Sequence, residues 1–149
     1  MHSTHTTRRL TDSTSQRAID IGSEIGPQHC PGTPVEQVTA YVGNSLVREP
    51  LFIDVAYARS LGFRGIVVPG PMVTAFLEQL LRRELVGWHL DRLSTTFRMP
   101  TITGDPIILS GVITELHEMA DGERIICDLV VEHESGEQAV TGVATLRRV

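Results

Sequence analysis

The chain has 149 residues, enough for one domain with a hydrophobic core and too few for two domains of ordinary size. All 13 basic residues are arginine, and the sequence contains no lysine. Without an ε-amine the chain cannot form a Schiff base with a carbonyl substrate or with pyridoxal phosphate, and it lacks the lysine of P-loop proteins and kinases. The formal charge of −5 argues against a nucleic-acid partner, because nucleic-acid-binding proteins usually present a basic face.

The cysteine content and the hydropathy pattern indicate a cytoplasmic protein. Cys30 and Cys127 are too few for a disulfide framework or a CxxC zinc site. No apolar run approaches the ~18 residues that span a bilayer. We therefore expect no metal, no cofactor and no membrane partner.

The amino-terminal part of the chain changes character near residue 18. Residues 1–18 are rich in Ser, Thr and charged side chains without an apolar period, so they are predicted to form a disordered tail. Residues 19–149 are predicted to form a single domain. Its first segment, residues 19–34, mixes short apolar groups with Gly and Pro and is expected to contain at most one short strand.

A first helix is predicted after this segment. Thr33 has the position of an N-cap, Pro34 that of the first helical residue and Glu36 that of the capping-box partner. The apolar positions that follow are expected to share one face: Val35, Val38, Tyr41 and Val42.

Two further helices are predicted in the middle of the chain. Residues 54–61 can form a short helix capped by Asp54 and ended by Gly62. A short buried strand at residues 66–68 then leads into the longest helical pattern, which covers residues 71 to about 86 and is apolar over about half its circumference.

The second half of the chain has the composition of consecutive strands separated by glycine-containing turns. An α+β fold is therefore predicted, with an antiparallel β-sheet wrapped around the long helix. The expected strands are Ser94–Met99, Ile107–Glu115, Arg124–His133 and Gln138–Arg147.

Residues 48–81 are the region that best suits a functional site, since the common catalytic motifs of hydrolases, metalloproteases and nucleotide-binding proteins are absent. The predicted long helix begins next to Gly70, where unpaired N–H groups can stabilise a thioester carbonyl or an enolate oxygen. A turn with a purely structural role is the alternative.

This region resembles the core motif of the MaoC-like hot-dog family, which contains (R)-specific enoyl-CoA hydratases and β-hydroxyacyl-thioester dehydratases. The resemblance extends over roughly residues 35–149 and implies a hot-dog fold, with a sheet around the helix of residues 71–86 and pairing into dimers. The matching positions are Pro50, Leu51, Asp54, Ala58, Gly62, Phe63, Val67 and Gly70, followed by Phe97, Arg98, Pro100, Gly104 and Asp105.

The departures from the family pattern concern its catalytic groups. Val47 and Phe52 stand where the family has the Asp and His that act as acid and base, and neither side chain carries a transferable proton. Glu49 replaces an Asn, and Pro69 replaces the His before Gly70. Gly70, whose N–H is the oxyanion donor in relatives, is retained.

The candidate site residues follow from these comparisons. Glu49 and Gly70 are the candidate catalytic residues, although Glu49 could instead pair with Arg48 or Arg64. For Asp54, capping of the following helix is the alternative to a role in binding. The predicted substrate-binding residues are Val47, Phe52, Asp54, Pro69 and Met72.

Three functions compete on this evidence. The first is an enzyme of fatty-acid or polyketide metabolism with an altered site, which carries out dehydration, isomerisation or cyclisation. The second is a non-catalytic binding subunit of a heterodimeric dehydratase, and the third is an unmodified (R)-enoyl-CoA hydratase. The ligand would be an acyl thioester of CoA or of a carrier protein, bound by a homodimer or a heterodimer of hot-dog subunits. Its phosphates would contact arginines near the motif, namely Arg48, Arg59, Arg64, Arg82 and Arg83.

Overall fold

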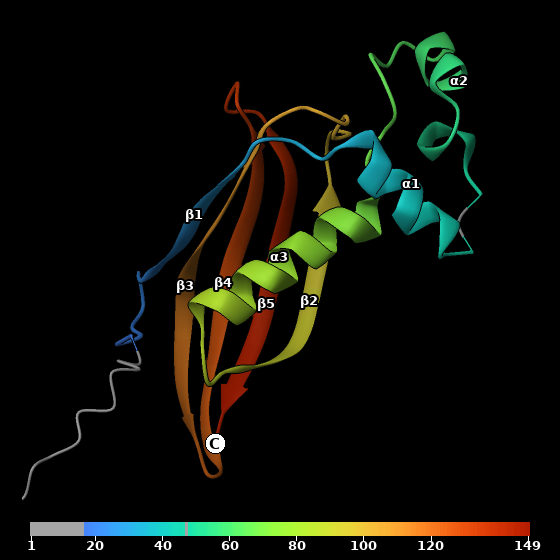
Figure 1. Ribbon diagram of the computed structural model, residues 1–149. Coiled ribbons are helices and arrows are strands. Elements are labelled where there is room, and N and C mark those ends of the chain that lie inside the picture. Colours follow the sequence, from blue (N-terminus) through green and yellow to red (C-terminus); the bar gives the residue numbers. More distant parts are fainter. Residues whose placement is uncertain (1–16, 47) are drawn as a thin grey trace, which may run out of the picture.

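The computed structural model of the chain describes residues 17–46 and 48–149. Most of the predicted tail, residues 1–16, and the predicted binding residue Val47 lie outside the described residues. The described part consists of one antiparallel sheet, one long helix and a group of short helices at one end of the sheet (Figure 1). Their order along the chain is β1 (Glu24–Cys30), α1 (Val35–Gly43), η1 (Pro50–Phe52), α2 (Val55–Ser60), α3 (Gly70–Glu84), β2 (His89–Phe97), β3 (Ile107–Met119), β4 (Gly122–His133) and β5 (Gln138–Arg148).

The five strands form one sheet in the order β1-β3-β4-β5-β2, with every neighbouring pair antiparallel. Helix α3 lies across one face of this sheet, as Figure 1 shows. The predicted α+β architecture, a sheet wrapped around a central helix, is therefore confirmed.

The core lies between α3 and the sheet because apolar residues face each other there. Along β4 the side chains alternate, and those on the side of α3 are fully buried while Asp128 between them is exposed. Leu77 and Leu81 of α3 are 0% exposed and pack against this face. Burial of these side chains is the main driving force for the fold. The buried residues of β4 are Ile125, Cys127, Leu129 and Val131.

Two helix boundaries differ from the prediction. Helix α1 begins at Val35 with Pro34 as its N-cap residue, so Thr33 does not cap it and Glu36 completes no capping box. Thr33 is instead buried, and its carbonyl accepts a hydrogen bond from the Gly104 N–H at 2.9 Å. The buried face of α1 is also narrower than predicted, since Val35 is 47% exposed.

The long helix is shorter than predicted because the chain turns before β2. Helix α3 ends at Glu84 instead of about residue 86, because residues 85–88 form a turn in which the Trp88 N–H donates to the Leu85 carbonyl. The predicted strand at residues 66–68 is reduced to one bridge between Val67 and Ile102.

Residues 48–65, which we call the overhanging segment, carry η1 and α2 beyond the end of the sheet (Figure 1). The predicted cap of α2 is confirmed: an Asp54 side-chain oxygen accepts hydrogen bonds from the N–H groups of Ala56 and Tyr57 at 3.0 and 3.2 Å. A hydrogen bond from the Val67 N–H to the Leu51 carbonyl holds η1 beside the chain that leads into α3. None of the described helices has both the length and the apolar composition needed to cross a membrane.

Candidate functional site

A pocket of about 400 Å³ lies where the overhanging segment, the start of α3 and the end of β2 meet. Segments that are far apart in sequence form its wall, and most of the side chains they contribute are apolar. The lining residues are Leu51, Phe52, Val67, Val68, Gly70, Val73, Phe97, Arg98, Met99, Pro100, Thr101 and Val140. We call this the Gly70 pocket.

The start of α3 contributes an unpaired donor to the Gly70 pocket. The N–H groups of Met72 and Val73 both donate to the Pro69 carbonyl, at 3.0 and 3.2 Å, and Pro71 has no N–H. Within residues 17–46 and 48–149, the Gly70 N–H donates to no protein acceptor. The positive end of the helix dipole lies at the same place, so a ligand oxygen can be stabilised there.

Phe97 covers this helix start. A Cβ atom at Gly70 would lie only 2.9 Å from Cζ of the Phe97 ring, which shows that the ring lies directly against the glycine. Phe97 is nevertheless 51% exposed. The ring therefore forms one wall of the Gly70 pocket on one side and faces solvent on the other.

The lining of the Gly70 pocket offers few groups for proton transfer. Arg98 is the one titratable residue among the described lining residues, and the Arg98 Nε donates to the Thr141 hydroxyl at 3.3 Å. Arginine stays protonated in proteins, so it cannot serve as a general base. Phe52, at the position of the family's histidine, is partly buried against the core. The described lining can thus bind and orient a ligand, but it contains no acid/base pair.

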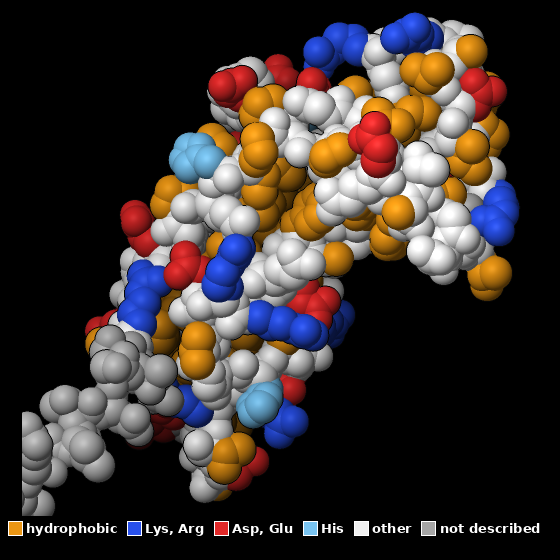
Figure 2. All heavy atoms as spheres, in the orientation of Figure 1, with side chains coloured by type: hydrophobic (Ala, Val, Ile, Leu, Met, Phe, Trp, Pro, Cys, Tyr) orange, Lys and Arg blue, Asp and Glu red, His pale blue; other side chains and the backbone are white. Residues whose placement is uncertain are grey.

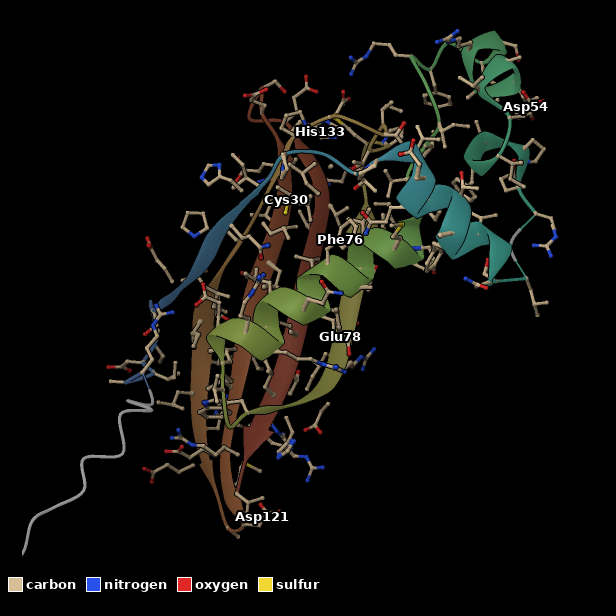
Figure 3. All side chains as sticks on the ribbon, viewed as in Figure 1. Cys30, Asp54, Phe76, Glu78, Asp121 and His133 are labelled. Carbon is tan, nitrogen blue, oxygen red and sulfur yellow. The ribbon has the colours of Figure 1, made fainter. Side chains whose placement is uncertain are left out.

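The structure brings two of the predicted site residues, Phe52 and Gly70, into this pocket. Glu49 precedes η1 with an exposed side chain and is not among the lining residues. Asp54 caps α2 and is also exposed; Figure 3 shows it on the part of the chain that carries α2, away from the sheet.

The remaining predicted binding residues lie behind the pocket wall. Met72 is 4% exposed and belongs to the hydrophobic core, two residues after Gly70 in the first turn of α3. Pro69 is buried at the N-cap position of α3, where its carbonyl accepts the first hydrogen bonds of the helix. Both residues shape the helix start, while the lining itself is made by their neighbours Val68 and Val73.

Sequence reasoning missed the lining residues that come from the second half of the chain. Phe97 and Pro100 were recognised as part of a motif but not as part of a site. Val140 and Thr101 carry no local signal, because only the sheet order places β5 and the loop after β2 beside the start of α3.

A second hollow of about 550 Å³ adjoins the Gly70 pocket and shares Met99 and Pro100 with it. Its wall contains three carboxylates, and one of them, Asp105, forms an ion pair with Arg64 at 2.5 Å. Arg64, an arginine predicted near a phosphate, therefore has an acidic partner in the described structure. The carboxylates are Asp105, Glu134 and Glu137.

A larger hollow, of about 860 Å³, lies on the face of the sheet opposite α3. Small residues of the strands such as Ser94, Ser110 and Thr141 line it, and it does not include Gly70. Across the described parts of the chain, no group of three or more His, Cys, Asp or Glu side chains is arranged to hold a metal ion.

The fold has counterparts among solved structures. An (R)-hydratase from A. caviae involved in PHA biosynthesis superposes with a TM-score of 0.79 at 22% sequence identity, covering 89% of this chain and 99% of that chain. A MaoC-like dehydratase from Rhodospirillum rubrum gives a TM-score of 0.75 at 17% identity, with 87% and 92% covered. The HadBC (3R-hydroxyacyl-ACP dehydratase) complex from Mycobacterium tuberculosis gives 0.73 at 21% identity, with 87% and 98% covered.

These similarities establish the architecture of the chain: it has the hot-dog fold of the MaoC-like dehydratases and (R)-hydratases. The fold implied by the sequence motifs is therefore confirmed. No protein-family model matches the sequence, and no curated protein matches it.

Proposed function

We propose that this chain binds an acyl thioester in the Gly70 pocket. The observation that carries the proposal is the Gly70 N–H at the start of α3, which has no partner among the described residues and borders an otherwise mainly apolar pocket. The thioester carbonyl would accept a hydrogen bond from this N–H, and the acyl chain would lie against Phe52, Val73 and Val140. One of the structural counterparts is named as a 3R-hydroxyacyl-ACP dehydratase, which supports this choice of ligand.

The chemistry proposed for this chain alone is that of an altered lyase-type site. Dehydration, isomerisation and cyclisation of an acyl thioester all need a group that moves a proton, and the described lining supplies none. Glu49, the carboxylate directly before η1, is the acid/base that we propose for turnover without a partner. The η1 segment would have to bring this exposed side chain to the mouth of the pocket when substrate is bound.

A second candidate function is a binding subunit of a heterodimer. Such a subunit needs a surface for its partner chain, and the outer edge of β2 pairs with no further strand among the described residues. Both β1 and β2 are edge strands, but β1 contains Pro27, which has no N–H to donate. Strand β2 contains no proline, and its backbone can pair with the edge of a second subunit. Phe97 and Met99, which are 51% and 38% exposed, lie at the end of this edge beside the pocket.

The overhanging segment supplies a further apolar surface for such a partner. Ile53, Val55 and Leu61 are 55%, 43% and 54% exposed, and Figure 2 shows exposed hydrophobic side chains over this end of the molecule. Apolar groups clustered in this way are typical of a protein interface. We propose that a second hot-dog subunit covers them, as a copy of this chain or as a different chain that carries the missing acid/base pair. We propose that this chain acts in the cytoplasm, in fatty-acid or polyketide metabolism.

One experiment separates these functions. The molar mass of the purified chain in solution is measured to find its oligomeric state. Its affinity for crotonyl-CoA is measured by calorimetry, and hydration of crotonyl-CoA is followed by the loss of its ultraviolet absorbance. Binding without turnover by a stable homodimer supports an altered enzyme, and binding without turnover by a monomer supports a missing partner. Rapid hydration by a homodimer contradicts the subunit proposal. Failure to bind crotonyl-CoA, its saturated analogue butyryl-CoA and the oxygenated esters 3-hydroxybutyryl-CoA and acetoacetyl-CoA contradicts the proposed function as a whole.

A further inference from the structure

Thr101 is a buried polar residue in a mainly apolar pocket. It follows β2 in the loop of residues 98–106, is only 4% exposed, and lines the Gly70 pocket. Among the described residues, one other polar or charged residue, Thr33, is as deeply buried, and it lines none of the pockets described above.

The hydrogen-bonding groups of Thr101 are incompletely used. Its carbonyl accepts from the Val68 N–H at 2.8 Å, but neither its N–H nor its hydroxyl makes a hydrogen bond within the described residues. The hydroxyl is not sealed inside the protein either, because His133 Nε2 is the one side-chain atom of the described residues that is both fully buried and unpartnered. The hydroxyl therefore reaches open space, and the hollow that adjoins Thr101 is the Gly70 pocket.

The position of Thr101 relates these donors to the start of α3. The hydrogen bond with Val68 fixes Thr101 beside a residue two positions before Gly70. Thr101 and Gly70 line the same pocket, so a ligand held by the Gly70 N–H would occupy the space that Thr101 also borders. A donor that a bound ligand covers without pairing loses its hydrogen bonds to water, so such groups in native proteins are usually paired with a ligand or with ordered water.

We propose that Thr101 is a specificity-determining residue, whose hydroxyl and N–H bind an acceptor oxygen carried by the acyl group near the thioester. The inference rests on the proposed function, because it concerns which acyl thioester enters the Gly70 pocket. A ligand that lacks this oxygen leaves the two donors unpaired in an apolar surrounding. The pocket therefore favours an oxygenated acyl group over a plain hydrocarbon chain of equal length.

The test compares three CoA esters that differ only at the third carbon: butyryl-CoA, 3-hydroxybutyryl-CoA and acetoacetyl-CoA. Their affinities for the full chain are measured by calorimetry for the wild type and for Thr101→Val, which keeps the shape of the side chain and removes the hydroxyl. Thr101→Ser restores a hydroxyl, and Thr33→Val is the matched control, because it alters the other buried threonine. Thermal unfolding of each variant checks that it is folded.

We expect the wild type to bind at least one oxygenated ester about tenfold or more tightly than butyryl-CoA. Thr101→Val should lose most of this preference, because the affinities for the oxygenated ester and for butyryl-CoA converge when the hydroxyl is removed, while Thr101→Ser and Thr33→Val should keep it. Tighter binding of 3-hydroxybutyryl-CoA identifies the acceptor as a hydroxyl oxygen, and tighter binding of acetoacetyl-CoA identifies it as a ketone oxygen. Equal wild-type affinity for all three esters, or an unchanged preference in Thr101→Val, overturns the inference alone. No binding of any ester overturns the proposed function with it.

Discussion

Gly70 illustrates how one residue can be required for two different reasons. Its N–H is a donor at the start of α3 without a partner in residues 17–46 and 48–149, and its missing Cβ leaves room for the Phe97 ring. The proline on either side supplies no N–H, so the glycine provides the first free donor of the helix. At this position the backbone itself forms the candidate binding group, which side-chain chemistry would not reveal.

Replacement of Gly70 by Ala should weaken ligand binding more than it weakens the fold. The new Cβ would meet the Phe97 ring at 2.9 Å, and the ring, as the end of a flexible side chain, would shift into the pocket. We expect affinity for crotonyl-CoA to fall about tenfold or more, measured by calorimetry, with a small change in Tm. Gly65→Ala is the control, since its Cβ would make an ordinary contact of 3.5 Å. Equal affinities of both variants would remove Gly70 from the site.

Glu49 tests whether the chain can carry out chemistry alone. If the isolated chain hydrates crotonyl-CoA, Glu49→Gln should lower kcat about 100-fold with little change in KM, because the amide cannot exchange a proton. Glu36→Gln, an exposed change in α1, is the control. An unchanged kcat would exclude Glu49 and direct the search for the acid/base to a partner chain.

At the scale of elements, η1 and α2 bring Leu51 and Phe52 to the start of α3. These helices are short, and the local order depends on the Asp54 cap and on the hydrogen bond between Val67 and Leu51. The cap could be predicted from the sequence because Asp is a preferred residue at the position before a helix, where its carboxylate accepts hydrogen bonds from the first N–H groups. The bond to Val67 joins residues 16 apart and follows from tertiary structure.

Loss of the Asp54 cap should loosen the overhanging segment. Asp54→Ala removes the acceptor of two backbone N–H groups and should cost about 1 kcal/mol of helix stability. Hydrogen exchange of the α2 amides is expected to accelerate, and ligand affinity to fall, because the wall that contains Phe52 becomes less ordered. Asp121→Ala, at an exposed position in the turn between β3 and β4, should change neither quantity. Unchanged α2 exchange in Asp54→Ala would show that the cap contributes nothing to this order.

At the scale of the whole molecule, one core joins α3 to all five strands. Cys127 lies within this core at 0% exposure, and burial, with a smaller contribution from Asp128, raises the pKa of its thiol from 9.0 to about 12. The folded protein therefore keeps this proton at a pH where the unfolded chain releases it. The thiol thus links the stability of the entire domain to alkaline pH.

The sign of this effect is a loss of stability as pH rises. Between pH 9.0 and about 12 the unfolded state binds fewer protons at Cys127 than the folded state, so its free energy falls relative to that of the folded state. The free energy of unfolding of the wild type, measured with denaturant, should fall more steeply between pH 9 and 11 than that of Cys127→Ala. The Cys127→Ala variant gives the pH dependence that all other groups contribute. Parallel pH profiles of the two proteins would contradict the raised pKa.

The sequence by itself determined the architecture and the helix start at Gly70. Alternating strands, glycine turns and a half-apolar helix are local patterns, and each one predicts its element from the periodicity of side chains alone. The exchange of the family's Asp and His for Val47 and Phe52 was equally visible, because it depends only on residue identity.

The tertiary structure alone decided which residues surround the helix start. Thr101, Phe97 and Val140 join the Gly70 pocket because the sheet order carries β2 and β5 past α3, and no local pattern encodes that neighbourhood. The tertiary structure also gives two adjacent residues different positions. Met72 faces only the core, whereas Val73 is in the core and also lines the pocket. Successive residues of a helix point about 100° apart, so only packing against the sheet decides which of them lines a pocket.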